Sequence, residues 1–253
     1  MSQLTAAGES IAPAPEQIIL GALEESIVHA PDHPRREMAA AEETLLGQVV
    51  AFPMADPWAG RTVELAIKRA MDILGSLVGF VLLSPVFIVA AVMVKLTSPG
   101  PILYRQERVG RGNKVFTLYK FRTMVQDAEK DGPKWAEPDD DRVTWCGRFF
   151  RQTRIDELPQ LWNILRGEMS LVGPRPERKC FVNEFIKEEP RFAWRVAVKP
   201  GLTGWAQING GYDLKPSEKL AYDLHYIENH SLLIDLRIIL RTVGVVLRRD
   251  GAR

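Results

Sequence analysis

Cysteine is scarce in this sequence of 253 residues, in which Cys146 and Cys180 are the only two. Two thiols far apart in the chain do not make a disulfide framework, and a cysteine-based metal site is not expected. The N-terminus also lacks the basic start and apolar run of a secretory signal. The thiols are therefore predicted to be reduced and to face the cytoplasm.

Aromatic residues are missing from the start of the chain up to Phe52. Alanine, proline and glutamate dominate this region, and such a composition buries too little apolar surface to offset the entropy lost on ordering. Residues 1–57 are therefore predicted to form a disordered acidic tail without a catalytic role.

Basic residues are also rare in this region. Residues 1–60 carry nine acidic and two basic side chains, a net charge of −7, whereas the whole chain carries +1, so the remaining 193 residues carry +8. This excess fits an anionic partner, such as a phospholipid surface or a phosphorylated substrate, and it also fits an ordinary soluble surface.

Charge is absent from the 22 residues 73–94, which are long enough to cross a bilayer as one helix. Both flanks of this run are basic, however, and both would favour the cytoplasmic side. Ser84-Pro85 lies near its middle, where Pro85 would bend the helix into halves of roughly 17 Å, about half of the hydrocarbon core. A single span stays open, but we predict a re-entrant hairpin within residues 58–98.

Residues 99–253 are predicted to form a small domain, which makes the chain α+β and mainly helical. Two β-prone runs around a short Gly/Asn loop predict a β-hairpin over residues 102–109 and 114–121. Helices are expected over 143–152 and 180–189. Residues 199–210 are interpreted as a glycine-punctuated loop, which either brings Thr203, Trp205 and Gln207 to a ligand or is simply a tight connector.

The C-terminal helix expected over residues 231–249 carries leucine, isoleucine and valine along one stripe, with arginines interspersed. Such a stripe packs on a soluble core or lies in a membrane interface as an amphipathic helix. The basic residues beside the apolar segment favour the interface.

Residues 153–177 contain the most informative pattern. Asp156 and Glu157 are adjacent, and Pro159 predicts a short helix that starts near residue 155 or 156 and ends at Gly167. The acidic pair either caps this helix or forms a site where a carboxylate and a divalent cation meet a phosphate. In the second case, nearby arginines would hold the phosphate oxygens.

Five blocks of sequence, taken in order, resemble the bacterial sugar transferase family, the monotopic phosphoglycosyl transferases. The resemblance extends over about residues 63–249. The blocks are the apolar segment with Ser84-Pro85, Tyr-Lys-Phe-Arg-Thr-Met at 119–124, residues 155–176 from Ile-Asp-Glu-Leu-Pro-Gln-Leu to Gly-Pro-Arg-Pro, Lys-Pro-Gly-Leu-Thr-Gly-Trp-Ala-Gln at 199–207, and residues 222–241.

The resemblance implies transfer of a sugar 1-phosphate from a UDP-sugar to undecaprenyl (polyprenyl) phosphate, with release of UMP, at the start of exopolysaccharide or O-antigen-type synthesis. Family members are monotopic proteins on the cytosolic face of the inner membrane, so membrane phospholipid is an expected partner and nucleic acid is not. A homodimer and contact with downstream glycosyltransferases stay open.

The resemblance also implies roles for particular residues. Asp156 matches the nucleophile and Glu157 its partner, with Mg²⁺ at the pair. The other matches are Arg151 and Arg175, which would hold phosphate oxygens; Lys120 and Arg122, which would line the site; and Ser84-Pro85, which would make the membrane helix re-entrant.

Two rival functions are kept. Asp139, Asp140 and Asp141 form an acidic triplet that would suit a metal-dependent glycosyltransferase releasing UDP. A non-catalytic scaffold on a membrane surface would bind lipid and consume no nucleotide sugar.

Overall fold

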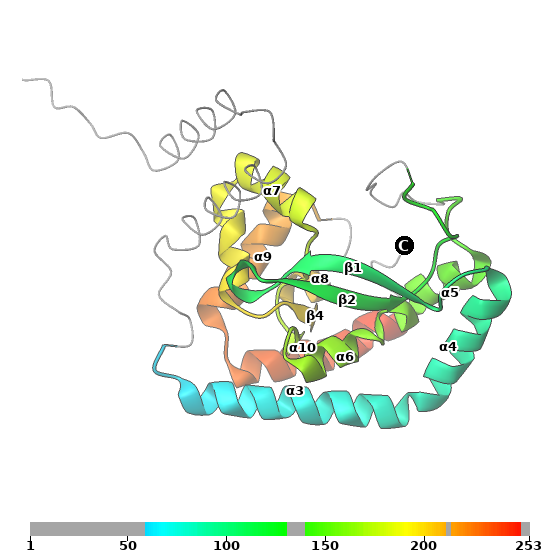
Figure 1. Ribbon diagram of the computed structural model, residues 1–253. Helices are drawn as coiled ribbons and strands as arrows, with labels where there is room; N and C mark the ends of the chain where they lie inside the picture. The colour runs from blue at the N-terminus through cyan, green and yellow to red at the C-terminus, as the bar shows by residue number, and fades with distance from the viewer. Residues whose placement is uncertain (1–58, 131–139, 211–213, 249–253) are drawn as a thin grey trace, which may run out of the picture. The chain divides into compact units, whose positions relative to one another are not determined.

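The computed structural model describes residues 59–130, 140–210 and 214–248, which belong to one compact unit (Figure 1). The predicted tail at 1–57 and Asp139 lie outside these ranges. The described part is mainly helical, with two small sheets of two strands each. The predicted mainly helical α+β class is confirmed.

Two helices meet at a sharp bend: α3 (Thr62–Leu82) and α4 (Ser84–Thr97) are inclined by 65°. Pro85 has no N–H to donate to the carbonyl of Val81, and the Ser84 hydroxyl donates to that carbonyl instead, at 2.8 Å. The predicted break at Ser84-Pro85 is confirmed. Among the described helices none is alone long and apolar enough to cross a membrane, although α3 and α4 together are.

The predicted β-hairpin is confirmed as β1 (Leu103–Val109) and β2 (Val115–Phe121), which pair antiparallel with Leu103 opposite Phe121. A 3₁₀ turn, Arg111–Asn113, joins them. Phe116 and Leu118 of β2 are buried, and strand alternation places Lys120 on the same face.

A hydrophobic core fills the space between the hairpin and the helices. Its residues come from β2, from α6 (Gln160–Arg166) and from the segment after α6; Phe80 and Phe87 reach it from α3 and α4. A neighbouring cluster joins α4 and Phe121 to Phe150 of α5 (Trp145–Thr153). The bent helix pair is therefore packed directly on the rest of the unit.

The second sheet pairs β3 (Ser170–Val172) with β4 (Gly201–Thr203) in parallel. Three helical segments complete the region between and after them: α7 (Lys179–Glu188), a 3₁₀ segment (Pro190–Ala197) and α8 (Trp205–Asn209). The predicted connector at 199–210 is wrong, because it holds a strand and a helix. Its glycines allow close backbone approach: a Cβ on Gly201 would lie 2.1 Å from the Gly173 nitrogen.

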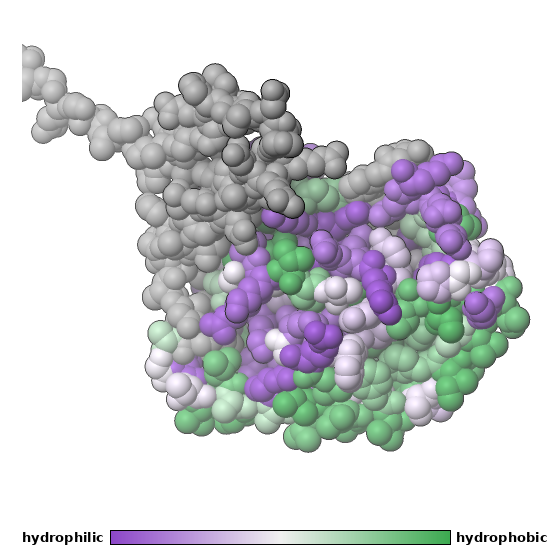
Figure 2. Space-filling model, in the orientation of Figure 1, coloured by the Kyte–Doolittle hydropathy of each residue, from purple (hydrophilic) through white to green (hydrophobic). Residues whose placement is uncertain are grey.

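Two longer helices, α9 (Pro216–Asn229) and α10 (Leu232–Arg248), end the described chain. The apolar stripe of α10 faces outward: Leu233, Leu240 and Leu247 are each at least 65% exposed, whereas Asp235 and Ile238 are buried. The interpretation that this stripe packs on the core is therefore wrong. Exposed apolar residues also lie along the outer faces of α3 and α4, and Figure 2 shows apolar surface along the lower edge of the molecule.

Candidate active site

The acidic pair lies in a short turn between α5 and α6. Arg154 adopts a left-handed conformation (φ 60°) after α5, and a 3₁₀ turn, Ile155–Glu157, follows. The predicted α-helical start at the pair is wrong in detail, since α6 begins at Gln160. An α-helix from Ile155 would need an N–H from Pro159, which has none, and the Leu158 N–H donates to the Ile155 carbonyl instead.

Glu157 is held by a two-pronged arginine contact. Arg175 Nη1 and Nη2 donate to its two carboxylate oxygens at 3.1 and 2.6 Å, and Arg154 lies 3.7 Å away. Burial by itself would raise the pKa of Glu157, but the charges of Arg175 and Lys120 outweigh it and hold the pKa below its ordinary range. Glu157 is therefore an ionised, oriented carboxylate.

Asp156 is buried to the same extent, with 6% of its surface exposed, but it is less compensated. Burial and the neighbouring Glu157 charge raise its pKa to about 6, against the opposing charges of Lys120, Arg175 and Arg151. Its Oδ1 atom is buried and accepts no hydrogen bond within the described structure. Asp156 therefore presents a free carboxylate oxygen close to neutral pH.

The other residues expected at the site lie in two places. Arg151, Arg175 and Lys120 all act electrostatically on Asp156, and Arg151 Nε also donates to Thr123 Oγ1 at 3.0 Å. Arg122 is buried and donates to the carbonyls of Pro99 and Ser98 at 2.6 and 2.7 Å. Arg122 thus ties the end of β2 to the segment that follows α4.

α6 is fixed to its neighbours by polar contacts as well as by the core. The fully buried Asn163 accepts from the Tyr119 N–H and donates to the Thr117 carbonyl. Arg69 of α3 donates to the carbonyls of Ile164 and Leu165 at the other end of the helix. Because α6 follows the acidic pair directly, these bonds help to position Asp156 and Glu157.

A second group of residues supports Arg175 and was not found from the sequence. Arg195 pairs with the buried Asp223 at 2.8 Å and donates to the Arg175 carbonyl at 2.8 Å. Arg108 donates to the carbonyl of Pro176 at 3.0 Å. Arg195 and Asp223 are 28 positions apart, so no local spacing could have signalled their contact.

The donor set at the pair suits a Mg²⁺ ion only in part. The described residues contain no group of three histidine, cysteine or carboxylate side chains able to hold a metal. Magnesium, however, is commonly held by one or two carboxylates together with water and substrate phosphates. The unbonded, buried Oδ1 of Asp156 fits such a ligand, while both oxygens of Glu157 already accept from Arg175.

The acidic triplet has a different environment. Asp140 is buried and accepts three hydrogen bonds from Arg142, through its backbone N–H, Nε and Nη2. Asp141 is exposed, and Asp139 lies outside the described residues. The two described members therefore do not converge as a pair of free carboxylates.

Comparison with known proteins identifies the family. The family model described as bacterial sugar transferase matches residues 63–249, which include the bent helices, the acidic pair and Arg175. The chain belongs to the bacterial sugar transferase family.

Individual members of the bacterial sugar transferase family are similar over most of the chain. The UDP-N-acetylgalactosamine-undecaprenyl-phosphate N-acetylgalactosaminephosphotransferase of Aeromonas hydrophila is 40% identical over 90% of this chain and 55% of its own length. The UDP-glucose:undecaprenyl-phosphate glucose-1-phosphate transferase of Caulobacter vibrioides is 43% identical, over 73% of this chain and 71% of its own. The exopolysaccharide production protein PSS of Rhizobium leguminosarum bv. phaseoli is 40% identical, over 74% and 98%. This chain thus spans about half of the Aeromonas relative and nearly all of the Rhizobium one.

Proposed function

We propose that this protein transfers a sugar 1-phosphate from a UDP-sugar to undecaprenyl phosphate and releases UMP. The observation that carries the proposal is the buried Asp156 carboxylate, with one oxygen unbonded, beside a Glu157 that is fixed by Arg175. The UDP-sugar and undecaprenyl-phosphate substrates in the names of the Aeromonas and Caulobacter relatives support this assignment. The Rhizobium name supports a place in exopolysaccharide synthesis.

The first step is attack by Asp156 on the phosphorus that carries the sugar. The new bond joins the carboxylate oxygen to phosphorus, and the bond that breaks is the one to the bridging oxygen, which leaves with UMP. In the second step an oxygen of undecaprenyl phosphate attacks the same phosphorus and frees the Asp156 carboxylate. Two displacements keep the anionic donor and acceptor from having to react directly with each other.

The surrounding cations would serve both steps. The charges of Arg151, Lys120 and Arg175 surround Asp156, where the transferred phosphoryl oxygens would lie. Glu157 keeps the Arg175 guanidinium in place, and Arg195 holds the Arg175 backbone. Asp156 would help to hold a Mg²⁺ ion, which would supply positive charge to offset the negative charge of the departing UMP.

The membrane arrangement is part of the proposal. The 65° bend and the exposed apolar residues of α3, α4 and α10 support a re-entrant hairpin and an interfacial helix on the cytosolic face of the inner membrane. This placement would let a soluble nucleotide sugar meet a lipid phosphate at the bilayer surface.

Nucleotide release tests the reaction. The membrane-embedded protein is incubated with Mg²⁺, undecaprenyl phosphate and UDP-N-acetylgalactosamine, UDP-glucose or UDP-galactose. We expect UMP from at least one donor, and a loss of at least about 10³-fold in Asp156→Asn, because the amide is not a nucleophile. Asp141→Asn, which changes an exposed carboxylate of the triplet, should retain activity. Release of UDP, or an active Asp156→Asn protein, would refute the mechanism, and no turnover of any donor by folded protein would favour the scaffold.

A further inference from the structure

One face of the β-hairpin extends across both strands from the side that meets the acidic pair. Directly opposite residues of an antiparallel pair lie on the same face, and Tyr104 of β1 lies opposite Lys120 of β2, with about 5 Å between their Cβ atoms. Gln106 shares this face, because residues two apart in a strand point to the same side. β2 contacts the turn that carries Asp156, and Lys120 has the largest effect among the positive charges that act on Asp156. Tyr104 and Gln106 therefore lie one strand away from the candidate active site.

Hydrogen bonds hold the polar side chains of this face in place. The Tyr104 hydroxyl donates to Glu129 Oε2 at 3.2 Å, and Gln106 Nε2 donates to the Tyr104 hydroxyl at 2.9 Å. Arg178 donates to both oxygens of Glu129 at 2.8 and 3.2 Å, and Arg108 donates to Gln106 Oε1. We call Tyr104, Gln106 and Glu129 the Tyr104 group. Its members are oriented by neighbours on both sides.

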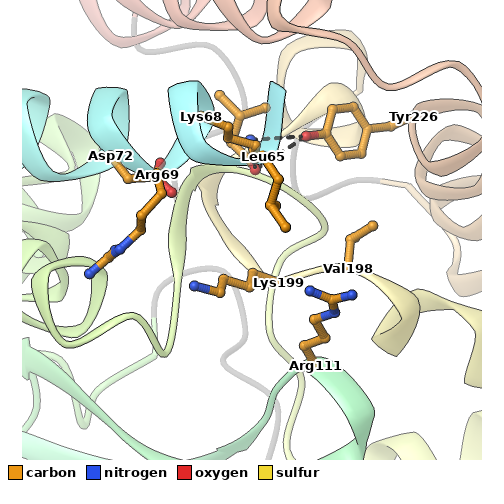
Figure 3. Close-up of a pocket in the computed structure, with 9 residues that line it drawn as sticks. Leu65, Lys68, Arg69, Asp72, Arg111, Val198, Lys199 and Tyr226 are labelled. Atoms are coloured by element: carbon orange, nitrogen blue, oxygen red, sulfur yellow. Dashed lines mark hydrogen bonds between the residues drawn. The ribbon is translucent and has the colours of Figure 1, made fainter. Parts of the chain in front are cut away.

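The chain that follows β3 borders the same face and is itself held firmly. The Val109 N–H, at the end of β1, donates to the Glu177 carbonyl at 3.0 Å. The carbonyl of Val172, in β3, accepts from Lys68 of α3 and from Tyr226 of α9. Figure 3 shows the Lys68 and Tyr226 side chains pointing toward each other. The Tyr104 group therefore lies between two fixed parts of the structure.

The Tyr104 group has the chemistry of a surface that binds a neutral, hydroxyl-rich ligand. Tyr104 is 36% exposed, and the Glu129 side chain is 29% exposed. A carboxylate accepts about four hydrogen bonds, and Glu129 accepts three from Arg178 and Tyr104; within the described residues, Gln106 uses one of its two amide N–H groups. An aromatic ring adds apolar contact beside these polar groups. Arg178 and Glu129 neutralise each other, which suits a sugar better than a phosphate.

We propose that the Tyr104 group binds the sugar of the donor. This proposal rests on the proposed transfer reaction, in which Asp156 attacks the phosphorus that carries the sugar. One ester oxygen separates the sugar from that phosphorus, whereas a second phosphate and a ribose separate the uracil base from it. The sugar is therefore the part of the donor that meets a surface beside Lys120. Hydrogen bonds to its hydroxyls would let the Tyr104 group distinguish sugars that differ at one position.

Fluorine NMR tests this contact directly. Full-length protein with 3-fluorotyrosine is placed in phosphatidylcholine nanodiscs, in an Asp156→Asn background that stops the proposed turnover. The signals of Tyr104 and Tyr119 are assigned by their loss in Tyr104→Phe and Tyr119→Phe. UDP-N-acetylgalactosamine, UDP-glucose or UDP-galactose is added with Mg²⁺, and parallel samples receive UDP or UMP. We expect at least one UDP-sugar to shift the Tyr104 signal and UDP not to shift it. Tyr119, opposite Arg105 on the other face of the hairpin, should not respond.

Donor selectivity separates a contact with the sugar from a structural role. Tyr104→Phe, with Asp156 intact, keeps the ring and removes the hydroxyl. The ratio of kcat/KM for the preferred donor to that for its 4-epimer should fall about 10-fold, because the lost hydrogen bond serves one epimer more than the other. A structural defect would lower both values alike and leave the ratio unchanged. Tyr119→Phe makes the same change on the opposite face and should preserve the ratio.

The outcomes distinguish failure of this site from failure of the proposed function. Equal shifts of the Tyr104 signal with UDP and with UDP-sugars would show that the surface binds the nucleotide, and would overturn the proposal. An unchanged Tyr104 signal would also overturn it when the uracil proton signals of the added donor show binding. If the wild type still releases UMP, only the sugar site is refuted. If no donor binds and none is turned over, the site and the transfer reaction are refuted together.

Discussion

Asp156 and Glu157 are neighbours in the chain and equally buried, yet their pKa values move in opposite directions. The difference comes from the arginines: Arg175 contacts both oxygens of Glu157, whereas Asp156 keeps a buried oxygen without a hydrogen bond. A pair of this kind separates the two roles that the proposed reaction needs. Glu157 fixes an arginine, and Asp156 stays available to form a bond.

The raised pKa of Asp156 predicts a cost in stability at neutral pH. The native pKa of about 6 exceeds the ordinary 3.8, so the folded state holds the proton more tightly than the unfolded state. The contribution of the Asp156 carboxyl to the free energy of unfolding is therefore fully present below pH 4. It is lost as the pH rises through 6, by about 3 kcal/mol at most. Asp156→Asn should be more stable than the wild type at pH 8, and the two should converge near pH 4.

Thermal unfolding in detergent with EDTA, which keeps metal ions from setting the ionisation of Asp156, measures this difference. Asp141→Asn makes the same chemical change at an exposed position and should alter stability by no more than about 0.5 kcal/mol. If Asp156→Asn is less stable than the wild type at pH 8, ionisation of Asp156 does not destabilise the folded protein, and the prediction is wrong.

Sequence reasoning selected the residues that carry the charge of this site but missed those that position them. Asp156, Arg151, Arg175 and Lys120 were selected through motif resemblance, and the structure brings their charges together. Arg195 was missed because a lone arginine becomes informative only when its partner is known, and that partner is remote in sequence.

At the scale of secondary-structure elements, α5 packs closely against the backbone that follows β2, and this close packing requires a glycine at position 147. A Cβ on Gly147 would lie 2.0 Å from the Thr123 carbonyl oxygen, a backbone atom that cannot simply rotate away. Gly147→Ala should therefore destabilise the protein by about 1–3 kcal/mol. It should also reduce activity, because Thr123 accepts the hydrogen bond from Arg151.

Gly244→Ala is the matched control for this change. Gly244 lies within α10, and the nearest atom to its added Cβ is the flexible end of Arg248 at 3.4 Å. Alanine should stabilise this helix by about 0.5–1 kcal/mol. The two variants are compared by thermal unfolding, and equal effects would contradict the role given to Gly147.

The bend between α3 and α4 predicts that both ends of the pair lie on the same side of the membrane. Val63 and Leu96 are exposed near the two ends, and single cysteines there can be labelled in a Cys180→Ser background. In sealed vesicles, a membrane-impermeant maleimide should reach both positions from the cytosolic side only. Labelling of the two positions from opposite sides would establish a span and refute the hairpin.

Local signals in the sequence predicted some elements well and others poorly. The hairpin followed from two β-prone runs around Gly110–Asn113, and the helix break followed from Pro85, because each depends on neighbouring residues. The strand at Gly201–Thr203 was missed because it forms only by pairing with Ser170–Val172, about 30 positions earlier. The glycines that indicated a loop instead permit that close pairing.

For the whole molecule, the outward stripe of α10 predicts a second region of membrane contact. A fluorophore sensitive to polarity, attached to Val243→Cys, should shift to the blue when vesicles are added. Val115→Cys is a matched control, because Val115 is a similarly exposed valine on the β-hairpin. Both variants carry Cys180→Ser. Equal spectra at the two positions would show that α10 does not enter the interface.

The contacts of α3 have a consequence for making a water-soluble version of the enzyme. Lys68 is the ion-pair partner of Asp235, and Asp72 is bonded to Ser170 and to the Leu171 N–H, so α3 supports the strand that leads to Arg175. Removing the helix pair by truncation would take away both the cation that pairs with Asp235 and the contacts of Asp72, a strongly destabilising change. A water-soluble version should therefore keep α3 and change only its outer surface. Polar residues would replace exposed apolar residues such as Leu74 and Val78, while the side chains of α3 that face the rest of the protein stay unchanged.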